Sequence, residues 1–308
     1  MSTIVAAKGP PAGLFAPLVT TFRGGDTLDL DAFAANLRAH LAAGVDGVVV
    51  AGSTGEAALL EEDERTRLLA MARPVVPDER WLIAGTGAES TRGTVRRCRA
   101  AAEQGADAVL VVAPHYYGQV MTLAALRAHY RRVADESPLP VLLYNIPKYM
   151  HFALPPELVA ELARHENVIG IKDSSGDLAL FGEYRAAQSE TFSLLTGNTG
   201  IVHEALRLGA RGGILAVSLF APEVTLRIFE AWRAGDVEGS AAAQATLAPL
   251  GVEIVGRMGV AGIKAALDLV GLRGGALRSP LQPLDETGVA RVAELLAAAG
   301  VTADVAAA

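Results

Sequence analysis

The segment AVLVVAPHYYGQVMTLAALRAHYRRVADESPLPVLLYNIP, residues 108–147, contains one strand–helix–strand unit. Its two ends, 108–114 and 141–147, are short apolar runs, and residues 122–135 between them have the apolar spacing of an amphipathic helix. Both runs are hydrophobic at nearly every position rather than at every second one. That pattern is typical of strands in a parallel sheet that is covered on both faces.

The same alternation of apolar runs and helical segments extends over most of the chain. Predicted strands cover residues 14–20, 47–52, 81–87, 108–114, 141–147, 168–174, 192–198 and 212–218. Predicted helices lie between them near 30–43, 61–76, 91–105, 122–135, 155–165, 177–188 and 199–209. This order predicts an α/β protein with a closed (β/α)8 TIM barrel. An open doubly wound sheet is the alternative, but it would be expected to carry a GxGxxG fingerprint, and none opens a helix here.

The strand pattern stops after about residue 220, and the rest of the chain is predicted to be helical. Helical patterns cover 222–233, 236–256, 260–270 and 285–299. The first is expected to be the eighth barrel helix and the others a C-terminal helical extension. We therefore predict a barrel over residues 1–233, which carries the active site, and an extension over 234–308. A barrel of about 250 residues with a short extension is compatible with a chain of this length.

Composition and charge indicate a folded protein whose main partner is neither nucleic acid nor an anionic membrane, and they do not exclude a small anionic substrate. Hydrophobic residues make up 51% of the chain and charged residues 20%, which predicts a large core. The net charge of -7 argues against nucleic acid or an anionic membrane as a partner. No apolar run approaches the ~20 residues that span a bilayer. The N-terminal MSTIVAAKGPPAG has no signal-peptide pattern, so we expect a cytoplasmic protein.

Cysteine and histidine give no sign of a metal site. Cys98 is the only cysteine, and its neighbouring arginines could lower the pKa of its thiol, but we expect it to be a bystander. The six histidines show neither an HExxH spacing nor a Cys/His cluster. We therefore expect no catalytic zinc.

Lys172 is the strongest single candidate for chemistry. It is one of only four lysines, and it follows the apolar run VIGI at the end of the predicted sixth strand. Barrel enzymes carry their active sites at the carboxyl ends of the strands, where partial burial lowers the pKa of an amine towards that of a Schiff-base nucleophile. A solvated strand-end lysine, or a local ion pair with Asp173, is the alternative. Lys8 and Lys264 are expected to be structural or solvated.

The segment GSTGE (52–56) is a candidate anion site at the end of the second predicted strand. Gly52 and Gly55 permit tight turns, and Ser53 and Thr54 offer hydroxyls beside backbone N–H groups. Such a loop can bind a carboxylate or a phosphate. It is not a P-loop, because no Gly-Lys-Ser/Thr follows. A generic turn between a strand and a helix remains the alternative.

Tyrosines stand after two further strands. Tyr116 and Tyr117 follow the fourth predicted strand, and Tyr144 ends the fifth. A phenol is both a donor and an acceptor, so it can relay protons near a carbinolamine, and Ser53 could link two such phenols. Aromatic packing at the barrel rim is the alternative, which we favour for Tyr116.

Taken in order, GSTGE, PHYYG (114–118), YNIP (144–147) and GIKDSSGD (170–177) resemble the dihydrodipicolinate synthase / N-acetylneuraminate lyase family. The resemblance covers the chain from about Leu14 to Leu284. It implies a (β/α)8 barrel with C-terminal helices, no cofactor, a small 2-oxo acid as substrate, and a homotetramer built from tight dimers.

The resemblance also implies roles for the matching residues. Lys172 would condense with the 2-oxo group of pyruvate, and Tyr144 would be the general acid/base. Ser53, Thr54 and Gly55 would bind the carboxylate. Tyr117 would complete a Tyr144–Ser53–Tyr117 relay from across the dimer interface. Further substrate-binding positions would be Tyr149, Ser174, Gly197 and Leu215.

Sequence details narrow the choice of reaction. Synthases of this family carry an arginine shortly after YNxP, whereas YNIPKYMH has Tyr149 there, with Lys148 or His151 as substitutes. The segments GTGAESTRGTV (85–95), KDSSGD (172–177) and GVAGIKAALDLVGLRGGALRSPLQPL (259–284) look like those of 4-hydroxy-2-oxoglutarate aldolases. The resemblance therefore favours a retro-aldol cleavage that releases pyruvate and an aldehyde.

Other functions stay open at this point. Within the family they are dihydrodipicolinate synthase and a 2-keto-3-deoxy sugar acid aldolase or dehydratase. A 2-oxo acid sensor without turnover is less well supported, because binding alone needs no proton relay. A phosphate-binding barrel would use the glycine-rich segments TGNTG (196–200) and GARGG (209–213).

Overall fold

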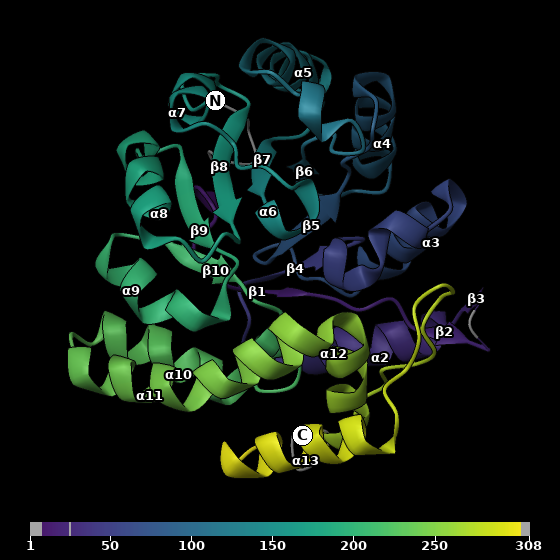
Figure 1. Cartoon of the computed structure of the whole chain (residues 1–308). Coiled ribbons are helices and arrows are strands. Elements are labelled where there is room, and N and C mark those ends of the chain that lie inside the picture. The colour runs from purple at the N-terminus through teal and green to yellow at the C-terminus, as the bar shows by residue number, and fades with distance from the viewer. Residues whose placement is uncertain (1–7, 25, 303–308) are drawn as a thin grey trace.

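The computed structural model describes residues 8–24 and 26–302, and its centre is a closed barrel of eight parallel strands (Figure 1). The strands are β1 (Gly13–Pro17), β4 (Gly47–Val50), β5 (Trp81–Gly85), β6 (Ala108–Val112), β7 (Val141–Asn145), β8 (Val168–Asp173), β9 (Ser193–Thr196) and β10 (Gly212–Ile214). Each pairs with the next in chain order, and β10 returns to pair with β1. The predicted (β/α)8 barrel is confirmed.

Helices follow the strands and surround the barrel. They are α2 (Leu30–Ala42), α3 (Glu62–Ala72), α4 (Thr91–Glu103), α5 (Leu123–Glu136), α6 (Pro147–Met150), α7 (Pro156–Leu162), α8 (Leu178–Tyr184), α9 (Val202–Arg207) and α10 (Pro222–Arg233). Strand residues are buried between these helices and the barrel interior, as the continuous apolar runs predicted. No helix of the described part of the chain is long and apolar enough to cross a membrane.

The C-terminal helices lie beside the barrel rather than apart from it (Figure 1). They are α11 (Val237–Pro249), a π-helix (Leu250–Met258), α12 (Gly259–Leu269) and α13 (Glu286–Ala298). The segment predicted to be helical over 236–256 is helical, but the α-helix ends at Pro249 and the chain continues as the π-helix. The division of the chain at residue 233 stays a prediction.

Two further differences between the prediction and the structure concern the strands. The predicted strands extend too far at their carboxyl ends, where the structure has loops or the beginnings of short helices instead. A hairpin of β2 (Phe22–Arg23) and β3 (Thr27–Leu28) follows β1 and was not predicted. Its strands have two residues each, which is too short to show a period.

The barrel closes at a point where β1 and β10 both carry glycine. Gly13 in β1 faces Gly212 in β10, and a Cβ atom on Gly212 would lie 2.0 Å from the Gly13 carbonyl oxygen. Gly13 also has a φ of +92°, which L side chains rarely adopt. The first and last strands therefore meet this closely because Gly212 carries no side chain, whereas a Cβ atom on Gly13 would meet the Asp46 side chain.

We predict that Gly212→Ala destabilises the barrel. The added methyl group would push β1 from β10, and overpacking of this kind lowers the free energy of unfolding by roughly 1–3 kcal/mol. Urea denaturation would measure the loss. The matched control is Gly182→Ala in α8, where a Cβ atom would have no atom within 4 Å and a stabilisation of up to about 1 kcal/mol is expected. Equal denaturation midpoints for the two variants would contradict the role given to Gly212.

Candidate active site

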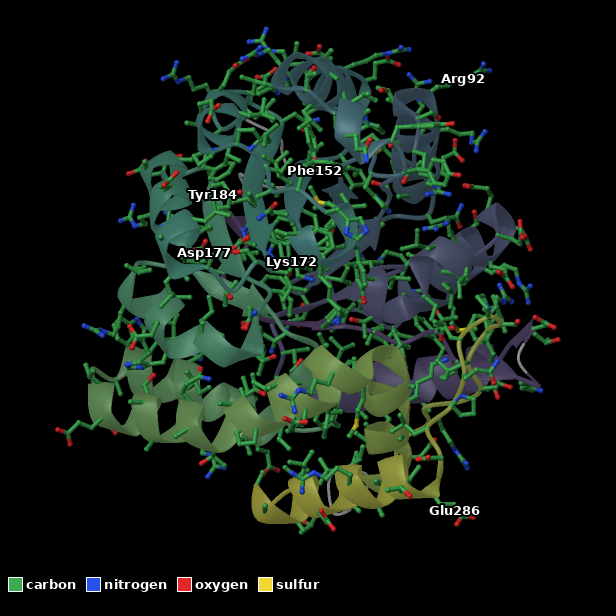
Figure 2. The ribbon with its side chains drawn as sticks, in the orientation of Figure 1. Arg92, Phe152, Lys172, Asp177, Tyr184 and Glu286 are labelled. Atoms are coloured by element: carbon green, nitrogen blue, oxygen red, sulfur yellow. The ribbon has the colours of Figure 1, made fainter. Side chains whose placement is uncertain are left out.

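A cavity of about 150 Å³ lies at the carboxyl ends of the barrel strands. Figure 2 shows Lys172 near the centre of the molecule, where the strands converge. Seven of the predicted site residues line the cavity: Ser53, Thr54, Tyr144, Tyr149, Lys172, Ser174 and Gly197. The fold therefore brings together residues from four separate sequence motifs.

Lys172 occupies the centre of this arrangement. It is the penultimate residue of β8 and only 6% exposed. Its partner across the β7–β8 pairing is Tyr144, and the Lys172 Nζ atom lies 4.3 Å from the centroid of the Tyr144 ring. An amine and a phenol are thus held side by side in a largely buried position.

Asp173 does not neutralise the lysine, because neighbouring residues of a strand point to opposite faces. Its buried carboxylate accepts hydrogen bonds of 2.7 Å from Asn145 Nδ2 and from Ser175 Oγ. Burial raises the pKa of the Asp173 carboxyl group, and these hydrogen bonds oppose that rise. The local ion-pair alternative is therefore not supported. Asp173 instead anchors the loop that follows Lys172.

Gly197 provides the space that Lys172 and Ser174 occupy. A Cβ atom at this position would lie 2.0 Å from Ser174 Oγ and 2.6 Å from Lys172 Cε. The Gly197 amide also donates a 2.6 Å hydrogen bond to the Asp173 carbonyl. A side chain here would displace the amine. Gly197 therefore contributes to the site by leaving space for Lys172 and Ser174.

The GSTGE segment forms a short 3-10 helix over residues 53–55, directly after β4. Ser53 and Thr54 line the cavity opposite the strand ends that carry Lys172 and Tyr144. Gly55 does not line it: this residue is buried, and its carbonyl accepts a 2.7 Å hydrogen bond from Thr20 Oγ1. The loop thus presents its two hydroxyl residues to the cavity and packs its glycine against the segment after β1.

Tyr117 lies outside the cavity of its own chain. Tyr116 and Tyr117 are 78% and 68% exposed, and their rings meet edge to face with centroids 5.0 Å apart. Packing at the rim therefore covers little of Tyr116. The relay Tyr144–Ser53–Tyr117 is not assembled within one chain.

Leu215 also does not line the cavity. It is fully buried, whereas its neighbours Ile214 and Ala216 are lining residues. The prediction thus chose the residue between the two that face the cavity.

Several lining residues were not predicted from the sequence. Asn198 and Thr199 belong to the TGNTG segment, which was considered only as a phosphate loop. Pro17, Ile146, Ile214 and Ala216 lie at or just after the ends of barrel strands. Six further residues come from the π-helix and α12: Gly251, Val255, Gly256, Gly259, Val260 and Ile263. Nothing in the barrel pattern indicates that these distant helices cover the mouth, although the segment from 259 onwards was part of the family resemblance.

The phosphate-binding alternative is not supported by the positions of its two glycine-rich segments. Residues 196–200 follow β9 at the cavity end of the barrel, but residues 209–213 precede and enter β10. Because all strands are parallel, the two glycine-rich segments lie at opposite ends of the barrel. They cannot form one anion site.

Cys98 and the histidines play no visible part in this site. Burial raises the pKa of the Cys98 thiol, contrary to the lowering that its arginine neighbours suggested, and its sulfur contacts Thr86 Oγ1 at 3.4 Å. Within residues 8–24 and 26–302, no group of three or more His, Cys, Asp or Glu side chains could hold a metal ion.

Comparison with known proteins identifies the family. The model of the dihydrodipicolinate synthetase family matches residues 10–299. A 4-hydroxy-tetrahydrodipicolinate synthase of Stenotrophomonas maltophilia is 40% identical over 277 residues, which are 89% of this chain and 91% of that protein. A DapA-like lyase of Halobacterium salinarum is 39% identical over 282 residues, 91% of this chain and 92% of that one.

Solved structures agree with this assignment. A dihydrodipicolinate synthase of Thermotoga maritima has a TM-score of 0.89 at 30% identity and covers 94% of this chain and 99% of its own. YagE of E. coli K12, a member of the same family solved in complex with pyruvate, has a TM-score of 0.88 at 32% identity over 94% and 99% of the two chains. The chain therefore belongs to the dihydrodipicolinate synthetase family of aldolase-type lyases, as its motifs predicted.

Proposed function

We propose that the protein is a class I aldolase that cleaves a 4-hydroxy-2-oxo acid to pyruvate and an aldehyde. The observation that carries this proposal is the buried amine of Lys172 beside the ring of Tyr144, in a cavity that Ser53 and Thr54 also line. A buried amine next to a phenol is the pair that imine chemistry requires.

The reaction begins with formation of the imine. Ser53 and Thr54 bind the substrate carboxylate through hydroxyl and backbone N–H groups. Lys172 Nζ attacks the C2 carbonyl, and the carbinolamine hydroxyl takes the Tyr144 proton and leaves as water. The products of this step are a protonated imine on Lys172 and a phenolate on Tyr144.

Cleavage of the C3–C4 bond follows, and the imine accepts the electron pair of this bond. The Tyr144 phenolate accepts the C4 hydroxyl proton, the C3–C4 bond breaks, and its electron pair moves into the imine to give an enamine. The aldehyde leaves. Tyr144 then protonates C3, and attack of water on the imine, with its surplus proton returned to Tyr144, releases pyruvate and the free lysine.

The residues around the second half of the substrate favour cleavage over the synthase reaction. Tyr149 stands where the synthase resemblance would place an arginine, and Ser174 lies beside Lys172. Burial and the nearby Tyr144 raise the pKa of the Tyr149 phenol, so it stays a neutral hydrogen-bond donor. Such hydroxyl groups suit the C4 hydroxyl and the aldehyde oxygen.

The position of Lys148 favours a substrate with a second acidic group, at the end remote from the 2-oxo acid. Among the described residues that line the cavity, Lys148 and Lys172 are the only cations. The Lys148 amine donates a 2.8 Å hydrogen bond to the Gly256 carbonyl on the π-helix. It can exchange this partner for a carboxylate, which 4-hydroxy-2-oxoglutarate and aspartate semialdehyde both carry, and 4-hydroxy-2-oxoglutarate is the first substrate to test.

Condensation of pyruvate with aspartate semialdehyde is the second candidate. It is favoured by the relatives at 35% and 40% identity that are named 4-hydroxy-tetrahydrodipicolinate synthase. Two other functions would use the same cavity: a 2-keto-3-deoxy sugar acid aldolase or dehydratase, and a 2-oxo acid sensor. A panel of candidate substrates would distinguish these functions. We further propose a homotetramer of tight dimers in the cytoplasm.

Borohydride reduction in the presence of pyruvate should attach the pyruvate carbon skeleton to Lys172. Mass spectrometry of the digested protein would locate the adduct. Lys172→Ala should abolish trapping, whereas Lys8→Arg, at a lysine remote from the cavity, should leave it unchanged. An unmodified wild type would contradict the proposed Schiff base.

The wild type should release pyruvate from 4-hydroxy-2-oxoglutarate faster than it consumes pyruvate with aspartate semialdehyde. A coupled dehydrogenase assay measures the first rate and loss of pyruvate the second. Tyr149→Arg should shift the ratio of the two kcat/KM values towards aspartate semialdehyde by roughly tenfold, the effect of one charge-assisted hydrogen bond. A wild type that prefers the semialdehyde would establish the synthase instead.

Tyr117 should act in the site of a partner chain, because its side chain is exposed and outside its own cavity. Tyr117→Phe and Lys172→Ala should each be nearly inactive alone. Mixed dimers contain one site with both native residues, so unfolding and refolding the two variants together should restore roughly a quarter of wild-type activity. No recovery in confirmed mixed dimers would contradict this role.

A further inference from the structure

A buried ion pair lies directly behind the carboxylate-binding loop. Glu56, the last residue of GSTGE, is only 3% exposed. Its Oε1 atom is 2.5 Å from Lys264 Nζ, and its Oε2 atom accepts a 2.9 Å hydrogen bond from the Arg278 amide. The reaction described above uses none of these three residues.

The other partner of the pair is fixed just as firmly. Lys264 in α12 is 3% exposed and donates a 2.6 Å hydrogen bond to the Ala276 carbonyl. Its Nζ atom lies 5.0 Å from the centroid of the Phe22 ring. A Cβ atom on Gly274 would lie 2.2 Å from the Lys264 carbonyl oxygen, so the chain after α12 packs closely on the helix.

Both partners are linked to residues that line the cavity, Glu56 by a hydrogen bond and Lys264 by its place in the chain. The Glu56 amide donates to the Ser53 carbonyl at 3.2 Å and so ends the 3-10 helix that carries Ser53 and Thr54. On the other side, Lys264 directly follows Ile263, which lines the cavity. The pair therefore joins the wall that binds the carboxylate to the wall that the C-terminal helices supply.

The backbone of Glu56 shows that this connection holds a specific geometry. Its φ of +57° lies in the left-handed region, which disfavours a residue other than glycine. This residue separates the 3-10 helix over Ser53–Gly55 from a second one over Ala57–Leu59. The ion pair holds the side chain of this residue.

A purely stabilising role accounts poorly for such a pair. Removal of two charges from water costs free energy, and well-packed apolar side chains often replace a buried ion pair without loss of stability. Apolar side chains would not, however, fix the relative orientation of the two segments as a directional ion pair does. The further contacts of Arg278, which pairs with Glu64 in α3 and lies 4.3 Å from the Phe22 ring centroid, extend the connection along the same loop.

We propose that Glu56 and Lys264 form a positioning pair that sets the Ser53–Thr54 loop for binding of the 2-oxo acid carboxylate. The pair acts through the loop and does not touch the substrate. This inference rests on the proposed Schiff-base function, because it assigns the carboxylate of that same substrate to the loop.

The double variant Glu56→Gln/Lys264→Met tests the proposal. It removes both charges together, keeps an acceptor for the Arg278 amide and approximately keeps both volumes, so it should fold. The measurement is borohydride trapping of pyruvate on Lys172 over a range of pyruvate concentrations. We expect the half-saturating concentration to rise roughly tenfold, as for weakening of a hydrogen bond to a carboxylate. The trapped fraction at saturation should stay close to that of the wild type.

The matched control is Lys8→Met. It breaks another largely buried pair, Lys8 Nζ–Asp107 Oδ2 at 2.8 Å, at the opposite end of the barrel. This control should lower the Tm and leave the half-saturating concentration unchanged. Should the double variant not fold, Glu56→Asp retains the charge but shortens the side chain, and it should raise the same concentration by a smaller factor.

The outcomes distinguish failure of the proposed positioning pair from failure of the proposed Schiff base. A folded double variant with wild-type half-saturation would show that the pair is only structural and would overturn the inference, as would wild-type half-saturation in a folded Glu56→Asp. A wild type that is not trapped at all would overturn the proposed Schiff base itself.

Discussion

The burial of one amine at the end of β8 is the constraint on which the rest of the site depends. Lys172 is in register with Tyr144 on β7 and with Leu195 on β9, so the barrel fixes its position from both sides. Its alternation with Asp173 leaves the amine facing the cavity while the carboxylate anchors a loop. The missing side chain of Gly197 then allows the lysine to extend into the cavity.

The sequence was sufficient for the fold because each barrel strand is a separate apolar run. It was insufficient where no such pattern exists. The strands β2 and β3 have two residues each, and the change from α-helix to π-helix after Pro249 leaves the apolar spacing nearly unaltered. The ends of strands were overestimated because the loops at the barrel mouth, such as the turn at Ala51, begin with residues as apolar as the strands themselves.

The site could be predicted to the extent that its residues stand at strand ends within motifs. Lys172, Tyr144 and Ser53 all do, and they line one cavity. Leu215 was predicted, whereas Ile214 and Ala216 line the cavity, because side chains alternate between faces along extended backbone such as that of Leu215. Contacts between segments far apart in the chain, such as that of Glu56 with Lys264, leave no local signal, and Lys264 looked like an ordinary helical lysine.

The origin of the cavity lining has a consequence for how the protein matures. The lining begins at Pro17 and is completed only by Ile263 in α12. During synthesis on the ribosome, the lysine and its tyrosine emerge well before the helices that wall them in. Until α12 docks, the mouth of the barrel lacks the part of its wall that the C-terminal helices supply. Docking of these helices is therefore the folding step that completes the cavity around Lys172.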